Sequence, residues 1–239
     1  MGMNVNSNNA VLTHEAELEI PKVINKNKDK TKIIYKAIKR IIDIIGGLVG
    51  TILLIPITAL LYIVTLFSKE NKGPLFFEQL RIGEEGKEFR LYKFRSMVMH
   101  ADEKLWEYLN NNPEAKEEYR KYKKLKKDPR ITKLGRFLRK TSLDEFPQFI
   151  NVLKGDMSLV GPRPYLYREK EDMGERYDTI IKAKPGLTGY WQVNGRSDVD
   201  FDERTKMDVK YVKDRNLWFD FKILLKTVLK VFGKKGGAL

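Results

Sequence analysis

A hydrophobic stretch without any charged side chain runs from Ile44 to Phe67 and covers 24 residues. A straight helix of this length measures roughly 36 Å, and the hydrocarbon core of a bilayer is about 30 Å thick. The stretch therefore predicts a membrane helix beside which the rest of the chain has to fold. Pro56 lies near its midpoint, where a proline removes a backbone donor and kinks or breaks the helix.

Basic residues flank this stretch on both sides, which restricts its topology. They are Lys22, Lys26, Lys28, Lys30, Lys32, Lys36, Lys39 and Arg40 before it, and Lys69, Lys72, Arg81, Lys87, Arg90, Lys93 and Arg95 after it. The positive-inside rule places both flanks on the cytoplasmic side, which a single crossing cannot do. A re-entrant helix that bends at Pro56 and returns to the same face satisfies the rule. A kinked spanning helix is the alternative.

Two further segments show an apolar stripe of helical spacing. Residues 31–43 lead into the hydrophobic stretch and carry isoleucines on one side. In Leu217–Phe232, Lys222, Lys226 and Lys230 recur at every fourth residue, and apolar and aromatic residues occupy the remainder. This pattern is typical of a helix that lies in the membrane interface with its lysines toward the headgroups. An amphipathic helix packed on the domain has the same pattern.

Gly46 and Gly50 are four residues apart in the first half of the hydrophobic stretch. This spacing occurs on the contact face of membrane-helix dimers, so a homodimer is one interpretation. The other is that the two glycines let another element of the same chain approach closely.

The charged and sulfur-containing residues limit the class of partner and of chemistry. The net charge of +14 indicates an anionic partner, which includes nucleic acid, an anionic bilayer and a phosphorylated substrate. The chain has no cysteine, and His14 and His100 are its only histidines. Disulfides and thiolate metal sites are excluded, and Mg²⁺ on carboxylates and phosphate is the metal that the composition favours.

The chain divides into four parts. Residues 1–30 are rich in Asn and Lys and predict a largely disordered segment. Residues 31–67 form the lead-in and membrane helix, residues 68–216 the main domain, and residues 217–239 the C-terminal amphipathic helix and tail. The expected fold class is α+β and dominated by helices.

Within the domain, the residues after Gly73 and Pro74 predict a small β-hairpin. Leu75–Ile82 and Glu88–Phe94 are rich in aromatic residues and flank a five-residue loop that contains two glycines. Ala101–Leu125 is strongly helical in composition, with an interruption around Asn110–Pro113.

An acidic pair, Asp144 and Glu145, follows a basic segment, Lys133–Lys140, that contains no acidic residue. Two adjacent carboxylates facing cations suit chemistry on a phosphate, in which a carboxylate attacks the phosphorus or binds a metal. Ser142 and Glu145 also have the spacing of a capping box, and Pro147 suits the first turn of a helix. The pair alone leaves both interpretations open.

Two loops could add to such a site. Gly161-Pro162-Arg163-Pro164 presents one arginine from a rigid turn. The segment from Pro185 to Asp198 combines glycines with Tyr190, Trp191 and Arg196, a composition suited to stacking a base and holding a phosphate. An ordinary connector with buried aromatic residues has the same composition.

These pieces, in this order, resemble the bacterial sugar transferases, the monotopic phosphoglycosyl transferases. Four motifs carry the resemblance, which covers roughly residues 35–232: Tyr92–Met97, Asp128–Thr132 through Leu143–Gln148, Gly161–Pro164, and Pro185–Gly189 through Asn194–Arg196. The family implies a membrane helix that re-enters at a proline, here Pro56. It also implies a location on the cytoplasmic face of the bacterial inner membrane.

The activity that the resemblance implies is the first membrane step of bacterial glycan assembly, for example of exopolysaccharide, O-antigen, capsule or glycoprotein. A sugar-1-phosphate passes from a UDP-sugar to undecaprenyl phosphate, and UMP is released. The family's catalytic acidic pair maps onto Asp144 and Glu145, with Asp144 as the nucleophile and as a ligand of Mg²⁺. We expect Asp144 to have a depressed pKa at a helix N-terminus.

The positive residues that match the motifs are the expected phosphate or nucleotide ligands: Lys93, Arg95, Arg139, Arg163 and Arg196. The role of Glu145 stays open between metal binding, acceptor positioning and proton handling. Nucleic acid is not an expected partner under this hypothesis.

Two alternatives need no catalysis. A basic, membrane-anchored module that binds nucleic acid accounts for the charge of +14, and tight, salt-sensitive nucleic-acid binding without UMP release would favour it. The second alternative is a scaffold protein that keeps the fold without the activity. This alternative does not explain why the arginines and the acidic pair occur together.

Overall fold

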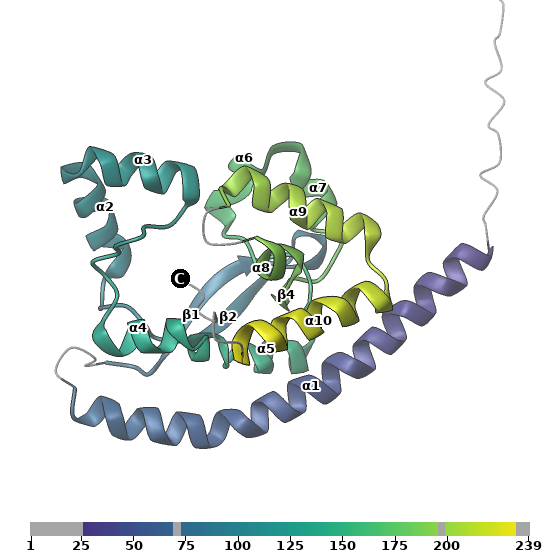
Figure 1. The fold of residues 1–239 in the computed structure, drawn as a ribbon, viewed down its shortest axis with the longest axis horizontal. Coiled ribbons are helices and arrows are strands. Elements are labelled where there is room, and N and C mark those ends of the chain that lie inside the picture. The colour runs from purple at the N-terminus through teal and green to yellow at the C-terminus, as the bar shows by residue number, and fades with distance from the viewer. Residues whose placement is uncertain (1–25, 69–72, 196–198, 233–239) are drawn as a thin grey trace, which may run out of the picture.

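The computed structural model describes residues 26–68, 73–195 and 199–232. Helix α1, Lys26–Leu66, runs as a long curved rod along one edge of the molecule (Figure 1). It begins before the expected boundary at residue 31, and residues 1–25 of the predicted disordered segment lie outside the described residues. Pro56 lies inside α1, which continues past it as one helix. The re-entrant path stays a prediction.

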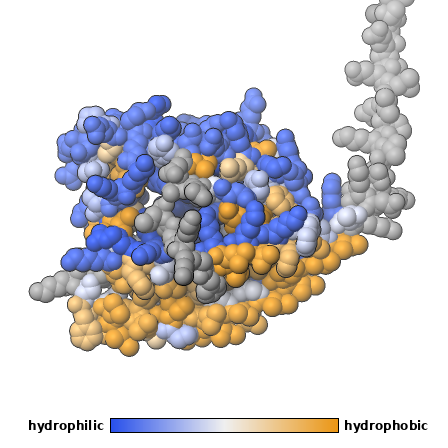
Figure 2. All heavy atoms as spheres, viewed as in Figure 1, coloured by the Kyte–Doolittle hydropathy of each residue, from blue (hydrophilic) through white to orange (hydrophobic). Residues whose placement is uncertain are grey.

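The side of α1 that faces away from the domain is apolar and exposed. By length and composition Thr31–Leu66 is able to cross a membrane. Most of its large apolar side chains are exposed, whereas Leu54 and Leu61 are buried in the core. In Figure 2 the apolar residues form a band along the edge occupied by α1, and polar residues cover the opposite side of the molecule.

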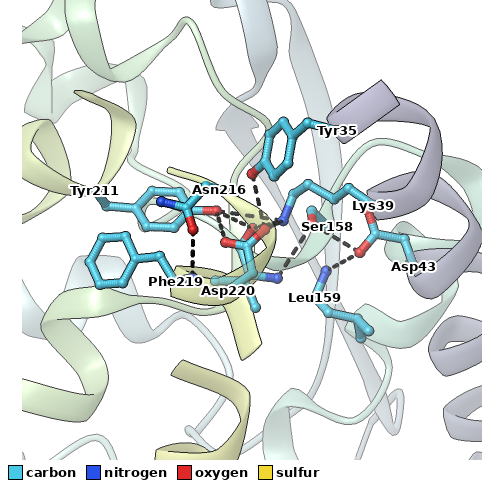
Figure 3. Close-up of polar contacts among 10 residues, drawn as sticks. Tyr35, Lys39, Asp43, Ser158, Leu159, Tyr211, Asn216, Phe219 and Asp220 are labelled. Carbon is cyan, nitrogen blue, oxygen red and sulfur yellow. Dashed lines mark hydrogen bonds and ion pairs between the residues drawn. The ribbon is translucent and has the colours of Figure 1, made fainter. Parts of the chain in front are cut away.

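A row of polar side chains on α1 attaches this helix to the domain (Figure 3). Lys39 Nζ lies 2.8 Å from the Asp220 carboxylate, and the Tyr35 hydroxyl donates to the same oxygen at 2.9 Å. One turn further on, Asp43 accepts hydrogen bonds from the Ser158 hydroxyl and from the Leu159 backbone N–H. Because these α1 residues are four apart, they share one side of the helix and fix which side faces outward.

The two spaced glycines of α1 pack against the same chain. A Cβ on Gly46 would meet the side chain of Leu159, and a Cβ on Gly50 would overlap the ring of Phe149. Phe149 belongs to α5, Gln148–Lys154, and Leu159 to the short strand β3, Ser158–Val160. Of the two interpretations, the structure bears out close packing within the chain, and the homodimer gains no support from this stripe.

The predicted β-hairpin is confirmed. Strands β1, Phe76–Ile82, and β2, Glu88–Phe94, pair antiparallel, and the short 3₁₀ helix η2, Glu84–Gly86, lies in the loop between them. A second sheet pairs β3 in parallel with β4, Gly186–Thr188. Most of the other described residues are helical, which confirms the helix-dominated fold class.

The expected helical segment at 101–125 is two helices. Helix α2, Ala101–Asn111, ends before Asn112, and α3, Pro113–Tyr122, has its proline at the first turn, where no backbone donor is needed. Leu105, Leu109 and Leu125 form a small separate core here. The remaining helices are α4 (Lys133–Lys140), η3 (Leu143–Glu145), η4 (Tyr167–Glu169), α6 (Lys170–Met173), η5 (Gly174–Arg176), α7 (Tyr177–Ile180), α8 (Tyr190–Asn194), α9 (Phe201–Asp214) and α10 (Leu217–Phe232).

The C-terminal helix α10 uses its lysines differently from the interfacial interpretation. Lys226 Nζ donates to the Asn194 side chain at 2.8 Å, and Lys230 Nζ donates to the Gln192 carbonyl at 2.7 Å. Both acceptors belong to α8, so these two lysines turn toward the domain rather than toward lipid headgroups. A different set of α10 side chains is apolar and exposed: Trp218, Phe221, Leu225, Val228 and Leu229.

Candidate active site

The acidic pair lies in η3, between α4 and α5. Thr132 caps α4 by accepting a hydrogen bond from the Gly135 N–H, and the chain then reverses at Ser142, which has a left-handed conformation with φ 56°. An N-cap residue needs extended backbone angles, and Ser142 makes no capping hydrogen bond with its side chain. The predicted capping box is therefore wrong.

Apolar side chains on either side of the pair connect it to the membrane helix. Leu143 and Phe146 pack in the same core as Leu54 and Leu61 of α1. Because these two α1 residues lie on either side of Pro56 in the sequence, the acidic pair sits over the middle of the hydrophobic stretch.

The two carboxylates differ in exposure and in partners. Asp144 is 7% exposed. Glu145 accepts a hydrogen bond from Lys93 Nζ at 2.8 Å, and the buried Gln148 side chain also hydrogen-bonds to it. Glu145 thus has a fixed partner on β2.

The pKa values of the pair move in opposite directions. Burial raises the pKa of Asp144 above its ordinary value, the charge of Lys93 opposes this rise, and the neighbouring carboxylate of Glu145 adds to it. Burial also raises the pKa of Glu145, but the charge and hydrogen bond of Lys93 outweigh it and hold that pKa below the ordinary value. The expected depressed pKa of Asp144 is wrong, because burial and a like charge outweigh any helix dipole in a turn of three residues.

Three of the five predicted basic residues lie around the pair. Besides Lys93, Arg139 donates from Nε to the Ser96 hydroxyl at 3.0 Å. Burial lowers the pKa of Arg139, and the nearby charge of Asp144 opposes this shift. The charge of Arg163 helps to lower the pKa of Glu145. The guanidinium of Arg95 contacts the sulfur of Met99 instead, and Arg196 lies outside the described residues.

The turn that presents Arg163 is held from two sides. Asp208 of α9, which is fully buried, accepts hydrogen bonds from the Arg163 backbone N–H at 3.0 Å and from the Tyr165 hydroxyl at 2.8 Å. On the other side, the Pro162 carbonyl accepts from the Gly186 N–H at 2.8 Å. Burial raises the pKa of Asp208 to about 7. Asp208 carries no motif signal in the sequence, and only the packing of α9 identifies it.

Sequence reasoning did not single out Arg81, which shares a strand face with Lys93. In the register of the hairpin, Phe77 lies opposite Lys93 and Arg81 lies opposite Phe89. Side chains alternate between the faces of a strand, so Arg81 shares one face with Lys93. Strand alternation applied to the predicted hairpin could have found it.

The aromatic residues of the 185–198 loop make contacts within the domain. The guanidinium of Arg204 lies 5.3 Å from the ring of Trp191, and Tyr190 packs edge-on against Phe219. Both rings therefore have partners within the domain, as the connector interpretation expects, but they are half-buried rather than buried.

A divalent cation has few protein ligands here. The described residues contain no group of three or more His, Cys, Asp or Glu side chains placed to hold a metal. Glu145 is paired with Lys93, which leaves Asp144 as the available carboxylate. This donor set fits Mg²⁺ that is held by one carboxylate together with substrate phosphates, rather than a cage made by the protein alone.

Comparison with known proteins identifies the family of the chain. A family described as bacterial sugar transferase matches residues 34–234. An undecaprenyl-phosphate galactose phosphotransferase of Salmonella typhimurium is 49% identical over 199 residues, which cover 83% of this chain and 41% of that protein. An uncharacterized sugar transferase of Haemophilus influenzae is 44% identical over 214 residues, 90% of this chain and 45% of that protein.

The exopolysaccharide production protein ExoY of Rhizobium meliloti is 41% identical over 202 residues, which cover 83% of this chain and 87% of that protein. The chain therefore spans less than half of the first two relatives and most of the third. The family match extends over α1, the hairpin, the acidic pair and α10. The chain belongs to the bacterial sugar transferase family.

Proposed function

We propose that this protein transfers a sugar-1-phosphate from a UDP-sugar to undecaprenyl phosphate and releases UMP. The observation that carries the proposal is the buried Asp144, set beside the Glu145–Lys93 ion pair and packed through its neighbours onto the membrane helix. A relative is named an undecaprenyl-phosphate galactose phosphotransferase, which supports the choice of acceptor and the class of reaction.

The proposed mechanism has two displacements. A carboxylate oxygen of Asp144 attacks the β-phosphorus of the UDP-sugar, and the bond from that phosphorus to the bridging oxygen breaks as UMP leaves. A phosphate oxygen of undecaprenyl phosphate then attacks the phosphosugar-aspartyl intermediate and displaces Asp144. The high pKa that burial gives Asp144 makes it a stronger nucleophile when it is ionised.

The other residues bind and orient. Lys93 holds Glu145 ionised, and Arg139 and Arg163 supply positive charge to the phosphates on either side of the pair. Mg²⁺ bound by Asp144 and the diphosphate would neutralise charge on the leaving UMP.

The nucleophile is tested with purified protein, undecaprenyl phosphate, Mg²⁺ and a panel of UDP-sugars. We expect the wild type to release UMP from at least one donor and Asp144→Asn to lose at least about 10³-fold in rate, since no covalent intermediate can form. Without acceptor, the wild type should gain the mass of one phosphosugar at Asp144. Asp102→Asn, an exposed aspartate on α2, is the control. Normal turnover by Asp144→Asn would contradict the proposal.

The re-entrant topology is part of the same proposal, with both ends of α1 on the cytoplasmic face. Because the chain has no cysteine, Lys32→Cys and Lys87→Cys give single labelling sites before and after the hydrophobic stretch. We expect an impermeant maleimide to label neither site in intact cells and both after permeabilisation. Labelling of one site only in intact cells would mean a helix that spans the membrane.

A further inference from the structure

We infer that Arg81 is a second phosphate-binding residue, which completes with Arg163 a two-arginine site for the diphosphate of the donor. This inference rests on the proposed function for the identity of its ligand. It assigns a role to a residue that none of the four sequence motifs contains.

The hairpin places Arg81 toward the acidic pair. Arg81 shares its face with Lys93, whose amine reaches Glu145 at 2.8 Å. The guanidinium donates from one nitrogen to the Pro164 carbonyl at 2.9 Å, so it lies against the turn that presents Arg163. Two cations thus share one strand face, a third lies on the adjoining turn, and the charges of both arginines interact with that of Glu145.

The hydrogen-bonding groups of the two arginines are incompletely used. Arg81 donates to two neutral acceptors, the Pro164 carbonyl and the Gln79 side chain. Its Nε and the Nε of Arg163 are both enclosed and have no acceptor among the described residues. Because buried donors are nearly always paired in native proteins, these two guanidinium nitrogens indicate a bound ligand, a water or an anion, that supplies the acceptor which the described residues do not.

The local charges give that ligand its sign. The carboxylate nearest to Arg163 is that of Glu169, at 3.9 Å, and its other oxygen already accepts from the Leu166 N–H. Burial, and next the charge of Arg163, lower the pKa of Arg81 to about 10, so Arg81 remains charged at neutral pH and the two guanidinium groups repel each other. The carboxylates near Lys93, Arg81 and Arg163 are those of Asp144, Glu145 and Glu169, and among the described residues none of them accepts a hydrogen bond from either guanidinium group. An anion bound between the two guanidinium groups would offset their mutual repulsion.

A diphosphate fits this arrangement better than a single carboxylate. Guanidinium groups bind phosphate oxygens through two parallel hydrogen bonds, and two arginines side by side can each take one phosphate. The competing interpretation is that Arg81 only supports the Pro162–Pro164 turn through its bond to the Pro164 carbonyl.

The test uses the full chain in detergent micelles, with inorganic pyrophosphate as the probe and sodium chloride at equal ionic strength as the reference. We expect pyrophosphate to raise the melting temperature of the wild type. We expect Arg81→Gln to bind pyrophosphate at least about tenfold more weakly than the wild type does. Arg81→Lys keeps the positive charge but loses the planar guanidinium that can form two parallel hydrogen bonds. Its affinity for pyrophosphate should lie between those of the wild type and Arg81→Gln, and its melting temperature without pyrophosphate should be near that of the wild type. The matched control is Arg90→Gln, on the opposite face of the same hairpin and 71% exposed.

With an active donor, Arg81→Gln should raise KM for the UDP-sugar about tenfold and change kcat less. The inference is overturned if pyrophosphate does not stabilise the wild type, or if Arg81→Gln binds pyrophosphate as tightly as the wild type and only melts earlier. If Arg81→Gln fails to fold, undiminished binding by Arg81→Lys overturns it. If pyrophosphate binding depends on Arg81 but no UDP-sugar yields UMP, the proposed function fails and the anion site stands.

Discussion

Asp144 and Glu145 are adjacent in the chain, yet one is nearly enclosed and the other is held by a lysine. This difference divides their roles in the proposed reaction. Glu145 stays ionised and paired, whereas the ionisation of Asp144 depends on the balance between burial and the charge of Lys93. A nucleophilic carboxylate must be ionised, so activity should fall at acidic pH through a pKa above the ordinary value of 3.8.

Lys93→Gln should shift this acidic limb to higher pH. An opposite charge close to a carboxylate lowers the carboxylate's pKa by about 1–3. Removal of the Lys93 ammonium should therefore raise the pKa of both Asp144 and Glu145. The measurement is the pH dependence of UMP release, with Lys87→Gln in the exposed hairpin loop as the control. An acidic limb at the same pH in Lys93→Gln and wild type would show that Lys93 does not set the pKa of the pair.

Asp208 gives a pH dependence of stability rather than of rate. Its pKa in the folded protein is about 7, against 3.8 for an ordinary aspartate. The folded state therefore binds the proton more tightly, and stability is lost as the pH rises from about 4 to about 7.

In the wild type, the free energy of unfolding should fall by an amount of the order of 4 kcal/mol over this pH range, at about 1.4 kcal/mol per pH unit. Asp208→Asn should make the free energy of unfolding nearly independent of pH over the same range. Denaturant unfolding of both proteins at several pH values measures the difference. Asp214→Asn, exposed on the same helix, should keep the wild-type slope. Parallel curves for wild type and Asp208→Asn would refute the assignment.

At the residue scale, the sequence predicts which residues meet better than it predicts their environment. Lys93, Arg139 and Arg163 do surround the pair, because motif matching identifies residues that converge on one place. The capping role of Ser142 and the depressed pKa of Asp144 were wrong, because both depend on the local turn and on burial that distant segments create.

Among the elements, α1 and α5 approach each other closely at Gly50. Gly50→Ala should destabilise the protein by about 1–3 kcal/mol, because its Cβ would overlap the ring of Phe149, although alanine is the better helix former. Thermal unfolding in micelles measures this, and a second change, Phe149→Leu, should restore part of the loss. Val49→Leu on the exposed side of α1 is the control. A dimer contact at Gly50 would instead change the oligomeric state and leave monomer stability intact.

Local patterns predicted the elements well where contacts are local. The hairpin strands and the break between α2 and α3 at Pro113 follow from alternation and from proline chemistry. The lysines of α10 show the limit of such patterns. Helical spacing placed Lys226 and Lys230 on one stripe, but their partners lie on α8, a distant segment whose position no local pattern reveals.

For the molecule as a whole, the apolar band is the feature that determines orientation. Exposed apolar residues of α1 and α10 lie toward one side, and α2 and α3 lie on the polar side (Figures 1 and 2). An apolar surface of this extent marks a membrane or protein contact. In the proposed orientation the band enters the bilayer, and α2 stays in water.

Brominated lipids test this orientation through two tryptophans of similar exposure. Trp218 on α10 is 62% exposed and Trp106 on α2 is 51% exposed. In variants that retain one of them, with the other tryptophans changed to phenylalanine, bromolipid should quench Trp218 strongly and Trp106 little. Equal quenching of the two would contradict the orientation.

The hairpin that carries Lys93 and Arg81 has one more consequence, which concerns chain length. Asn151 of α5 pins β2 by accepting from the Tyr92 N–H and donating to the Arg90 carbonyl. β1 has its own anchor, because the Ile82 N–H donates to the Tyr165 carbonyl at 2.9 Å. A slip of β1 by one position would break this bond and turn Arg81 to the other face of the hairpin. Both strands are thus fixed independently of the loop that joins them, and a residue added to or removed from that loop should leave Arg81 and Lys93 on one face.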